Sequence, residues 1–168
     1  GATISVSEVG GTGVVGVGAK SATANSSAIG ISNNGSFNLA GDLNIRVSAQ
    51  GGDASTVSGT ADSSAKAYGI SLLNGTMNLT GNVDIIAEAR KGNASSSGTK
   101  LIGAESVALR INGGILNINQ AGDKTVRIVG DINLAVPSSS GILNLRLNES
   151  GSYFQGLATN ISSSGGQN

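Results

Sequence analysis

The chain has 168 residues, a length that suits one domain or a short array of repeats. Ten Lys and Arg balance ten Asp and Glu, so no net charge draws the protein to nucleic acid or to an anionic membrane. The sequence contains neither Cys nor His, which excludes a disulfide framework, thiolate zinc sites and a Ser-His-Asp triad.

Hydrophobic residues make up 38% of the chain and aromatic residues 2%, so the sequence predicts a core of aliphatic and small side chains. No apolar run approaches the roughly 18 residues of a membrane-spanning helix, and we expect no membrane insertion of this segment. No signal peptide is recognisable. The first residue is Gly1 rather than Met, and we interpret the chain as an excised segment, or as one that begins with a cloning remnant.

The first predicted element is a strand over residues 3–9, where polar and apolar residues alternate. Residues 9–27 follow as a tract of Gly, Ser, Ala and Thr. We expect either this tract or the C-terminal tail to cover part of the unpaired strand edges that excision leaves at the ends of the molecule.

An internal repeat dominates the next part of the chain. Residues 28–49 match residues 67–89 almost position by position, with an offset of 39 at Gly30/Gly69 that becomes 40 from Gly35/Gly75 onward. A slip of one residue with register kept on both sides indicates a repeated structural unit. In this frame residues 3–9 match residues 44–50 and 84–90, so the chain opens late in a truncated repeat.

Each repeat predicts three short strands, which are residues 28–32, 36–40 and 42–49 in the first unit and 67–71, 76–80 and 82–89 in the second. Alternation places these side chains inward: Ile29, Ile31, Phe37, Leu39, Leu43, Ile45 and Val47, and their counterparts Tyr68, Ile70, Met77, Leu79, Val83, Ile85 and Ala87. Outward ladders are expected for Asn38 over Asn78, and for Asn44 beside Asp84 and Asn133. Corner columns are expected for Gly35, Gly75 and Gly114, and for Gly41, Gly81 and Gly130.

The third unit begins at residue 106, with Val107, Leu109 and Ile111 inward. Residues 124–136 then match residues 75–87 at an offset of 49, which predicts Val126 in one column with Phe37 and Met77, and about ten extra residues around 115–123. This match also places Ile128, Ile132 and Leu134 inward. Residues 141–145 echo residues 114–118.

Strands joined by tight corners cannot bury their inner faces alone, but stacked repeats can. We therefore predict a right-handed, single-stranded parallel β-helix, an all-β solenoid of three to four rungs. One segment spans 1–168, with units at about 28–66, 67–105 and 106–140, a partial unit at 141–161 and a loose tail at 162–168. Residues 50–66 and 90–105 form either long small-residue excursions or a second, poorer coil, and we favour excursions, which in solenoids often carry binding surfaces.

The phrases AYGISLLNGTMNLTGNVDI, AIGISNNGSFNLAGDLNI and GILNI resemble the passenger domains of Gram-negative autotransporters over about residues 28–147. This resemblance implies a β-helix displayed on the bacterial cell surface, anchored through an outer-membrane β-barrel elsewhere in the parent protein. It also implies an adhesive or structural role, with a host-cell or matrix receptor or self-association as the expected partner.

No residues are predicted to be catalytic, cofactor-binding or metal-binding. Gly11–Gly16 fits G-x-G-x-x-G, but neither a helix nor an acid follows at the required place. Asp42, Asp84 and Asp131 are scattered, and we interpret Arg46 and Asp84 as a solvated pair on one face. Two alternatives stay open: an enzyme acting on polysaccharide through carboxylates in a groove, and a self-associating scaffold.

Overall fold

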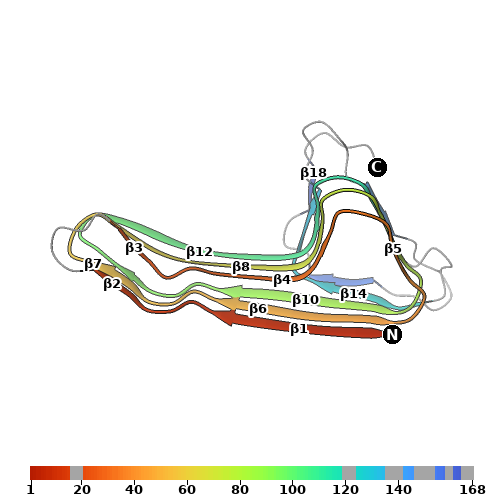
Figure 1. Ribbon diagram of the computed structural model, residues 1–168, viewed down its shortest axis with the longest axis horizontal. Helices are drawn as coiled ribbons and strands as arrows, with labels where there is room; N and C mark the ends of the chain where they lie inside the picture. The colour runs from red at the N-terminus through yellow and green to blue at the C-terminus, as the bar shows by residue number, and fades with distance from the viewer. Residues whose placement is uncertain (16–20, 119–123, 135–141, 146–153, 158–160, 164–168) are drawn as a thin grey trace.

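The computed structural model describes residues 1–15, 21–118, 124–134, 142–145, 154–157 and 161–163. These residues contain eighteen strands and no helix. The strands pair in parallel to form four sheets. The sheets stack as a β-solenoid of about three turns, with a triangular part at one end and a long flat arm at the other (Figure 1). The predicted all-β parallel solenoid is therefore confirmed.

One wall of the solenoid is a five-stranded sheet in the order β1-β6-β10-β14-β17. Its strands are β1 (Ala2–Val9), β6 (Leu43–Gln50), β10 (Val83–Arg90), β14 (Val126–Val129) and β17 (Phe154–Leu157). Residues 2–9 pair with residues 43–50, and these pair in turn with residues 83–90. The prediction that the chain opens late in a truncated repeat is confirmed.

Two further sheets complete the triangle. The opposite wall contains β3 (Ser21–Thr23), β4 (Ser26–Asn33), β8 (Thr60–Leu72), β12 (Thr99–Ile111), β15 (Asp131–Leu134) and β18 (Ile161–Ser163). The short third wall contains β5 (Phe37–Leu39), β9 (Thr76–Leu79), β13 (Ile115–Ile118) and β16 (Ile142–Leu145). Each strand stacks on the equivalent strand of the turn before it, which is the arrangement that the repeat predicts.

Aliphatic side chains fill the triangular part. Phe37 stacks on Met77, and Leu39 stacks on Leu79, as the repeat predicts. The largest fully buried side chains are Leu43, Ile45, Ile70, Leu72, Met77, Leu79, Ile85, Leu109, Ile111, Leu116, Ile118 and Ile128. Burial of each such side chain contributes roughly 1.5–3 kcal/mol. This core holds the three walls together.

The Gly- and Ser-rich tracts form the arm. Their strands β2 (Gly13–Val15), β7 (Ala54–Thr56) and β11 (Ala94–Ser95) make a small sheet at its tip, and β12 pairs with β8 along the whole arm. The tracts are therefore excursions that are themselves built of stacked strands, and they do not form a separate coil.

The two layers of the arm lie close together, which accounts for the composition of the tracts. Ala22, Ala24, Ala54 and Ala61 form a small buried cluster between the layers. The Ser63 hydroxyl donates a hydrogen bond to the Gly52 carbonyl across the arm. Larger side chains inside the arm would push the layers apart.

The third turn has no arm among the described residues. Residues 126–129 pair with residues 83–86, and residues 131–134 pair with the end of β12, so Gly130 alone joins the two walls. Gly130 has a φ of +126°, and a Cβ there would lie 2.9 Å from the Ala108 nitrogen. Only glycine fits this shortcut without strain. Because of the shortcut, the strands after β12 do not extend along the arm, and residues 99–105 of β12 form the last arm strand on this side (Figure 1). We call this place the step.

The shortcut overturns the register predicted for residues 124–136. Val126 stacks on Val83 rather than on Met77, whose next neighbour is Leu116. Asn133 pairs with Arg110 and does not lie in the column of Asn44 and Asp84. Residues 115–118 belong to a regular strand, so they are not extra residues. The prediction of a ten-residue insertion otherwise falls on residues 119–123, outside the described part of the chain.

The glycine columns are correct in one case and partly wrong in the other. A Cβ at Gly75 would lie 2.3 Å from the Gly35 carbonyl oxygen, and a Cβ at Gly114 would lie 2.2 Å from that of Gly75. Gly81 likewise stacks on Gly41, but Gly130 lies against residues 106 and 108 instead. The first column and the first two members of the second are therefore confirmed.

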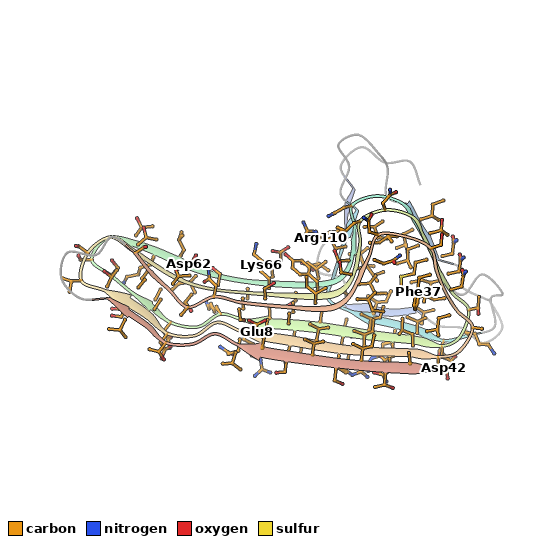
Figure 2. All side chains as sticks on the ribbon, viewed as in Figure 1. Glu8, Phe37, Asp42, Asp62, Lys66 and Arg110 are labelled. Atoms are coloured by element: carbon orange, nitrogen blue, oxygen red, sulfur yellow. The ribbon has the colours of Figure 1, made fainter. Side chains whose placement is uncertain are left out.

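The predicted inward position of Ile29 is also wrong. Ile29 is 43% exposed, while Ala28 beside it is buried in the core. In the next turn Ala67 takes the core position, and Tyr68 lies outside the core cluster with its ring 5.1 Å from the Arg110 guanidinium. A register irregularity near residue 108 breaks the alternation at this bend. Figure 2 shows Arg110 at the bend, Phe37 in the triangular part, and Asp62 and Lys66 along the arm.

The first two residues of the predicted tail, 162 and 163, lie within the described residues. Ile161–Ser163 form β18, which pairs with β15. The rest of the predicted tail, residues 164–168, lies outside the described residues, as do residues 135–141, which contain the end of the third predicted unit.

Candidate functional site

The outer face of the five-stranded sheet gathers polar side chains into columns. The strand register places Thr3, Asn44, Asp84 and Arg127 in one column. The next columns along the sheet are Ser5, Arg46, Ile86 and Val129, then Ser7, Ser48 and Glu88, then Val9, Gln50 and Arg90. Because side chains alternate along a strand, these columns share the outward face. The face therefore offers hydroxyl, amide, carboxylate and guanidinium groups within a few strands.

Three shallow hollows follow one another along this face. One of about 280 Å³ lies at the corner between Asp42, Asp84 and Arg127. One of about 350 Å³ lies over Ser5, Arg46 and Ile86, and one of about 430 Å³ lies toward the arm between Gln50 and Arg90. The last two share Ser7, Ser48 and Glu88 in their linings. These two hollows are therefore continuous, and together with the corner hollow on the same sheet they suit an extended partner better than a small enclosed ligand.

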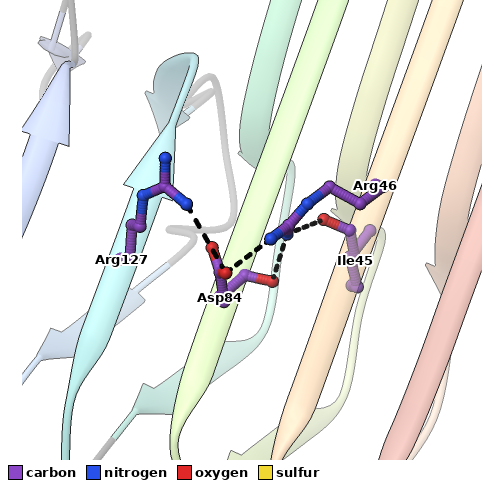
Figure 3. A network of polar contacts seen from close by, with 4 residues as sticks. All are labelled: Ile45, Arg46, Asp84 and Arg127. Atoms are coloured by element: carbon purple, nitrogen blue, oxygen red, sulfur yellow. Dashed lines mark hydrogen bonds and ion pairs between the residues drawn. The ribbon is translucent and has the colours of Figure 1, made fainter.

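An ion-pair network crosses three strands of the face (Figure 3). Arg46 Nη2 donates a hydrogen bond of 2.6 Å to Asp84 Oδ2, and Arg127 Nη1 lies 3.6 Å from the same oxygen. Arg46 Nη1 also donates to the Ile45 carbonyl at 3.1 Å. The three side chains are 30–44% exposed, so each pair contributes on the order of 1 kcal/mol or less. The predicted neighbourhood of Arg46 and Asp84 is confirmed, and the network clamps adjacent turns together.

The corner beside this network is held by a chain of hydrogen bonds. Asp42 Oδ1 accepts from the Asn82 backbone N–H at 2.8 Å and from Asn82 Nδ2 at 3.0 Å. The Thr125 backbone N–H and hydroxyl both donate to Asn82 Oδ1 at 3.0 Å. These bonds from Asn82, the backbone bond most of all, lower the pKa of Asp42 below its ordinary value. Asp42 is thus held as a carboxylate that fixes the corner, which is not the state of a general acid.

Outward ladders run along the other walls as well. Asn38, Asn78 and Asn117 are joined by hydrogen bonds in the third wall, so the ladder predicted for Asn38 and Asn78 is confirmed and extends one turn further. On the arm, Asn93 Nδ2 donates to Asp53 Oδ1 at 2.8 Å and Asn25 Nδ2 donates to Asp62 Oδ2 at 2.9 Å. Several outward polar side chains therefore bond to a side chain of a neighbouring turn.

The remaining sequence features take structural positions. Gly13–Val15 of the glycine-rich phrase form strand β2, which pairs with β7; Gly16 lies outside the described residues. Asp131 begins β15, on a different wall from Asp42 and Asp84. The described residues hold no group of three or more His, Cys, Asp and Glu that could bind a metal ion. No helix in this part of the chain is long and apolar enough to cross a membrane.

No family model, curated protein or solved structure matches this chain. What the chain can do is therefore argued from its own surfaces. The outer face of the five-stranded sheet combines the most varied polar groups with a run of hollows, and it is the candidate functional site.

Sequence reasoning missed one member of this face and one contact on the opposite wall. Arg127 was not placed beside Asp84, because residues 124–136 were assigned to the wrong wall. The contact between Tyr68 and Arg110 was missed because alternation placed Tyr68 inward. A signal for the first existed in the sequence: residues 126–128 have the same apolar-polar-apolar order as residues 83–85.

Proposed function

We propose that this chain is a structural and adhesive, non-catalytic segment of a surface-exposed autotransporter passenger. The outer face of the five-stranded sheet would be its contact surface, and a receptor on a host cell or in the extracellular matrix its partner. The parent protein would hold it at the bacterial cell surface through an outer-membrane β-barrel. The resemblance of the repeat phrases and the β-solenoid fold support this proposal.

The observation that carries the proposal is the state of the polar groups on the face. Asp84 pairs with two arginines, and Asp42 accepts hydrogen bonds from Asn82. Both carboxylates therefore hold neighbouring strands of the wall together. The exposed residues Ser5, Ser7 and Ser48 lie beyond Asp84 toward the arm, in the central hollow. A partner would make many weak contacts over this surface, and repetition of those contacts would provide avidity.

A binding experiment tests the proposal. The protein is immobilised and exposed to glycan and matrix-protein panels, and each ligand that binds is tested again with two variants. Ser48→Arg places a bulky cation in the middle of the face, whereas Thr80→Arg makes the same kind of change at an exposed position at the end of β9 on the third wall. We expect Ser48→Arg to weaken binding at least tenfold and Thr80→Arg to leave it unchanged.

Two results would contradict the proposal. Equal binding by both variants would show that the partner does not contact this face. Failure of every panel member to bind would contradict the adhesive role. Release of shorter products from an oligosaccharide would instead favour the enzymatic alternative, for which Asp42 and Asp84 line one hollow.

A further inference from the structure

Among the described residues, the arm has an open strand edge at the step. Residues 99–105 of β12 pair with residues 60–66 of β8 on one side. On the other side β15 pairs with β12 only from Val107 onward, because the shortcut at Gly130 omits the arm. An open edge of this kind is a template for another strand. A second copy of this chain carries the same edge, so the step is a place where self-association would start.

The inward side chains of β12 at the step differ from those of β8, one turn earlier. Ala61 and Ser63 point into the arm and are fully buried. The residues that stack on them are Lys100, which is exposed, and Ile102, which is 45% exposed. A cation and a large aliphatic side chain therefore stand in positions that hold Ala and Ser within the stack. Lys100 forms no ion pair within the described residues.

We infer that Lys100 and Ile102 close the arm at the step against pairing with a second copy of this chain. A strand added to residues 99–105 would bury an ionised group without a partner, which is costly. It would also press on Ile102, which stands where the previous turn has Ser63. Two-fold pairing of this edge with itself would bring two Lys100 side chains together. The flat outer faces of the arm remain available for a partner.

The test gives the step the residues of the turn before it. The variant K100A/I102S reproduces Ala61 and Ser63 at the end of their columns. Sedimentation velocity is measured over a hundredfold range of concentration for this variant and the wild type. The matched control K66A/L73S also removes one base and one large aliphatic side chain, but from exposed positions outside this edge.

We expect the double variant to associate as concentration rises, with hydrogen-exchange protection of amides 99–105 increasing at least tenfold. The wild type and the control are expected to show neither change. A double variant that remains monomeric would overturn the inference, as would a control that associates equally. If the double variant does not fold, the wild type decides: edge amides that gain protection with concentration would overturn the inference, and amides that stay unprotected would support it.

Discussion

Asn78 donates a hydrogen bond of 2.5 Å from Nδ2 to Asn38 Oδ1 and accepts one of 2.6 Å at Oδ1 from Asn117 Nδ2. One side chain therefore joins three successive turns of the third wall. This arrangement makes Asn78 the member of the ladder whose loss should be felt most.

Replacing Asn78 with Ala should lower the free energy of unfolding by about 1–2 kcal/mol, because it removes both bonds and leaves two partners to water. Urea unfolding measures the change. Ser36→Ala, at an exposed outward position in the same wall, serves as the control and should shift stability by less than about 0.5 kcal/mol. Equal effects of the two substitutions would show that the ladder contributes nothing specific.

Leu79→Asp should unfold the triangular part. Leu79 is 1% exposed and stacks between Leu39 and Ile118, so the new carboxylate would be buried without a partner. We expect a loss of at least about 4 kcal/mol, measured by thermal or urea unfolding followed by circular dichroism. Thr80→Asp puts the same charge at the exposed neighbouring position and should leave the melting temperature nearly unchanged. Unchanged melting of the Leu79 variant would contradict its inward position.

Gly130→Ala should strain the shortcut between the first and second walls. The substitution needs a φ of +126° at an L-residue and brings a Cβ within 2.9 Å of the Ala108 nitrogen. We expect it to destabilise the protein by about 1–3 kcal/mol. Gly103→Ala is the control, because a Cβ there meets only the Ser64 hydroxyl at 3.7 Å. A neutral Gly130→Ala substitution would mean that the shortcut has another backbone path.

Asp42 should make stability depend on acid. Hydrogen bonds from Asn82 lower the pKa of Asp42 in the folded state, so its carboxylate stabilises the fold at all pH values above the pKa of the unfolded chain. This contribution is lost as the pH falls through the lower, folded pKa. The difference in unfolding free energy between wild type and Asp42→Ala should therefore shrink from neutral pH into the acid range. A difference that is constant with pH would place the role of Asp42 outside its charge.

The sequence predicts the architecture well where one turn repeats the next. The offsets of 39 and 40 gave correct neighbours for Phe37, Leu39, Ile45 and Val47, because each strand stacks directly on its equivalent. The prediction of the wall that contains Val126 was wrong for a physical reason. Residues 124–136 and 75–87 share alternation and a central glycine, and the same pattern serves either a corner within one turn or a shortcut between two walls.

The position of Ile29 could not be read from periodicity, because alternation holds only while the strand is regular. At the bend near Gly69 and Ala108 the alternation breaks, although β12 and β8 keep their offset of 39, and residues before the bend face the opposite way from the prediction. The candidate site was predicted in part: Arg46 and Asp84 were placed together, but Arg127 depended on the wall that was misassigned.

The exchange of a twenty-residue detour, residues 87–106, for the single residue Gly130 has a consequence for how such a molecule can change. The triangular part continues past Gly130 with its parallel pairing intact. The length of the arm is therefore independent of the triangular part that carries it. An insertion or a deletion at this junction between the two walls would therefore lengthen or remove the arm of one turn without refolding the triangular part. The triangular part keeps its core while the arm varies.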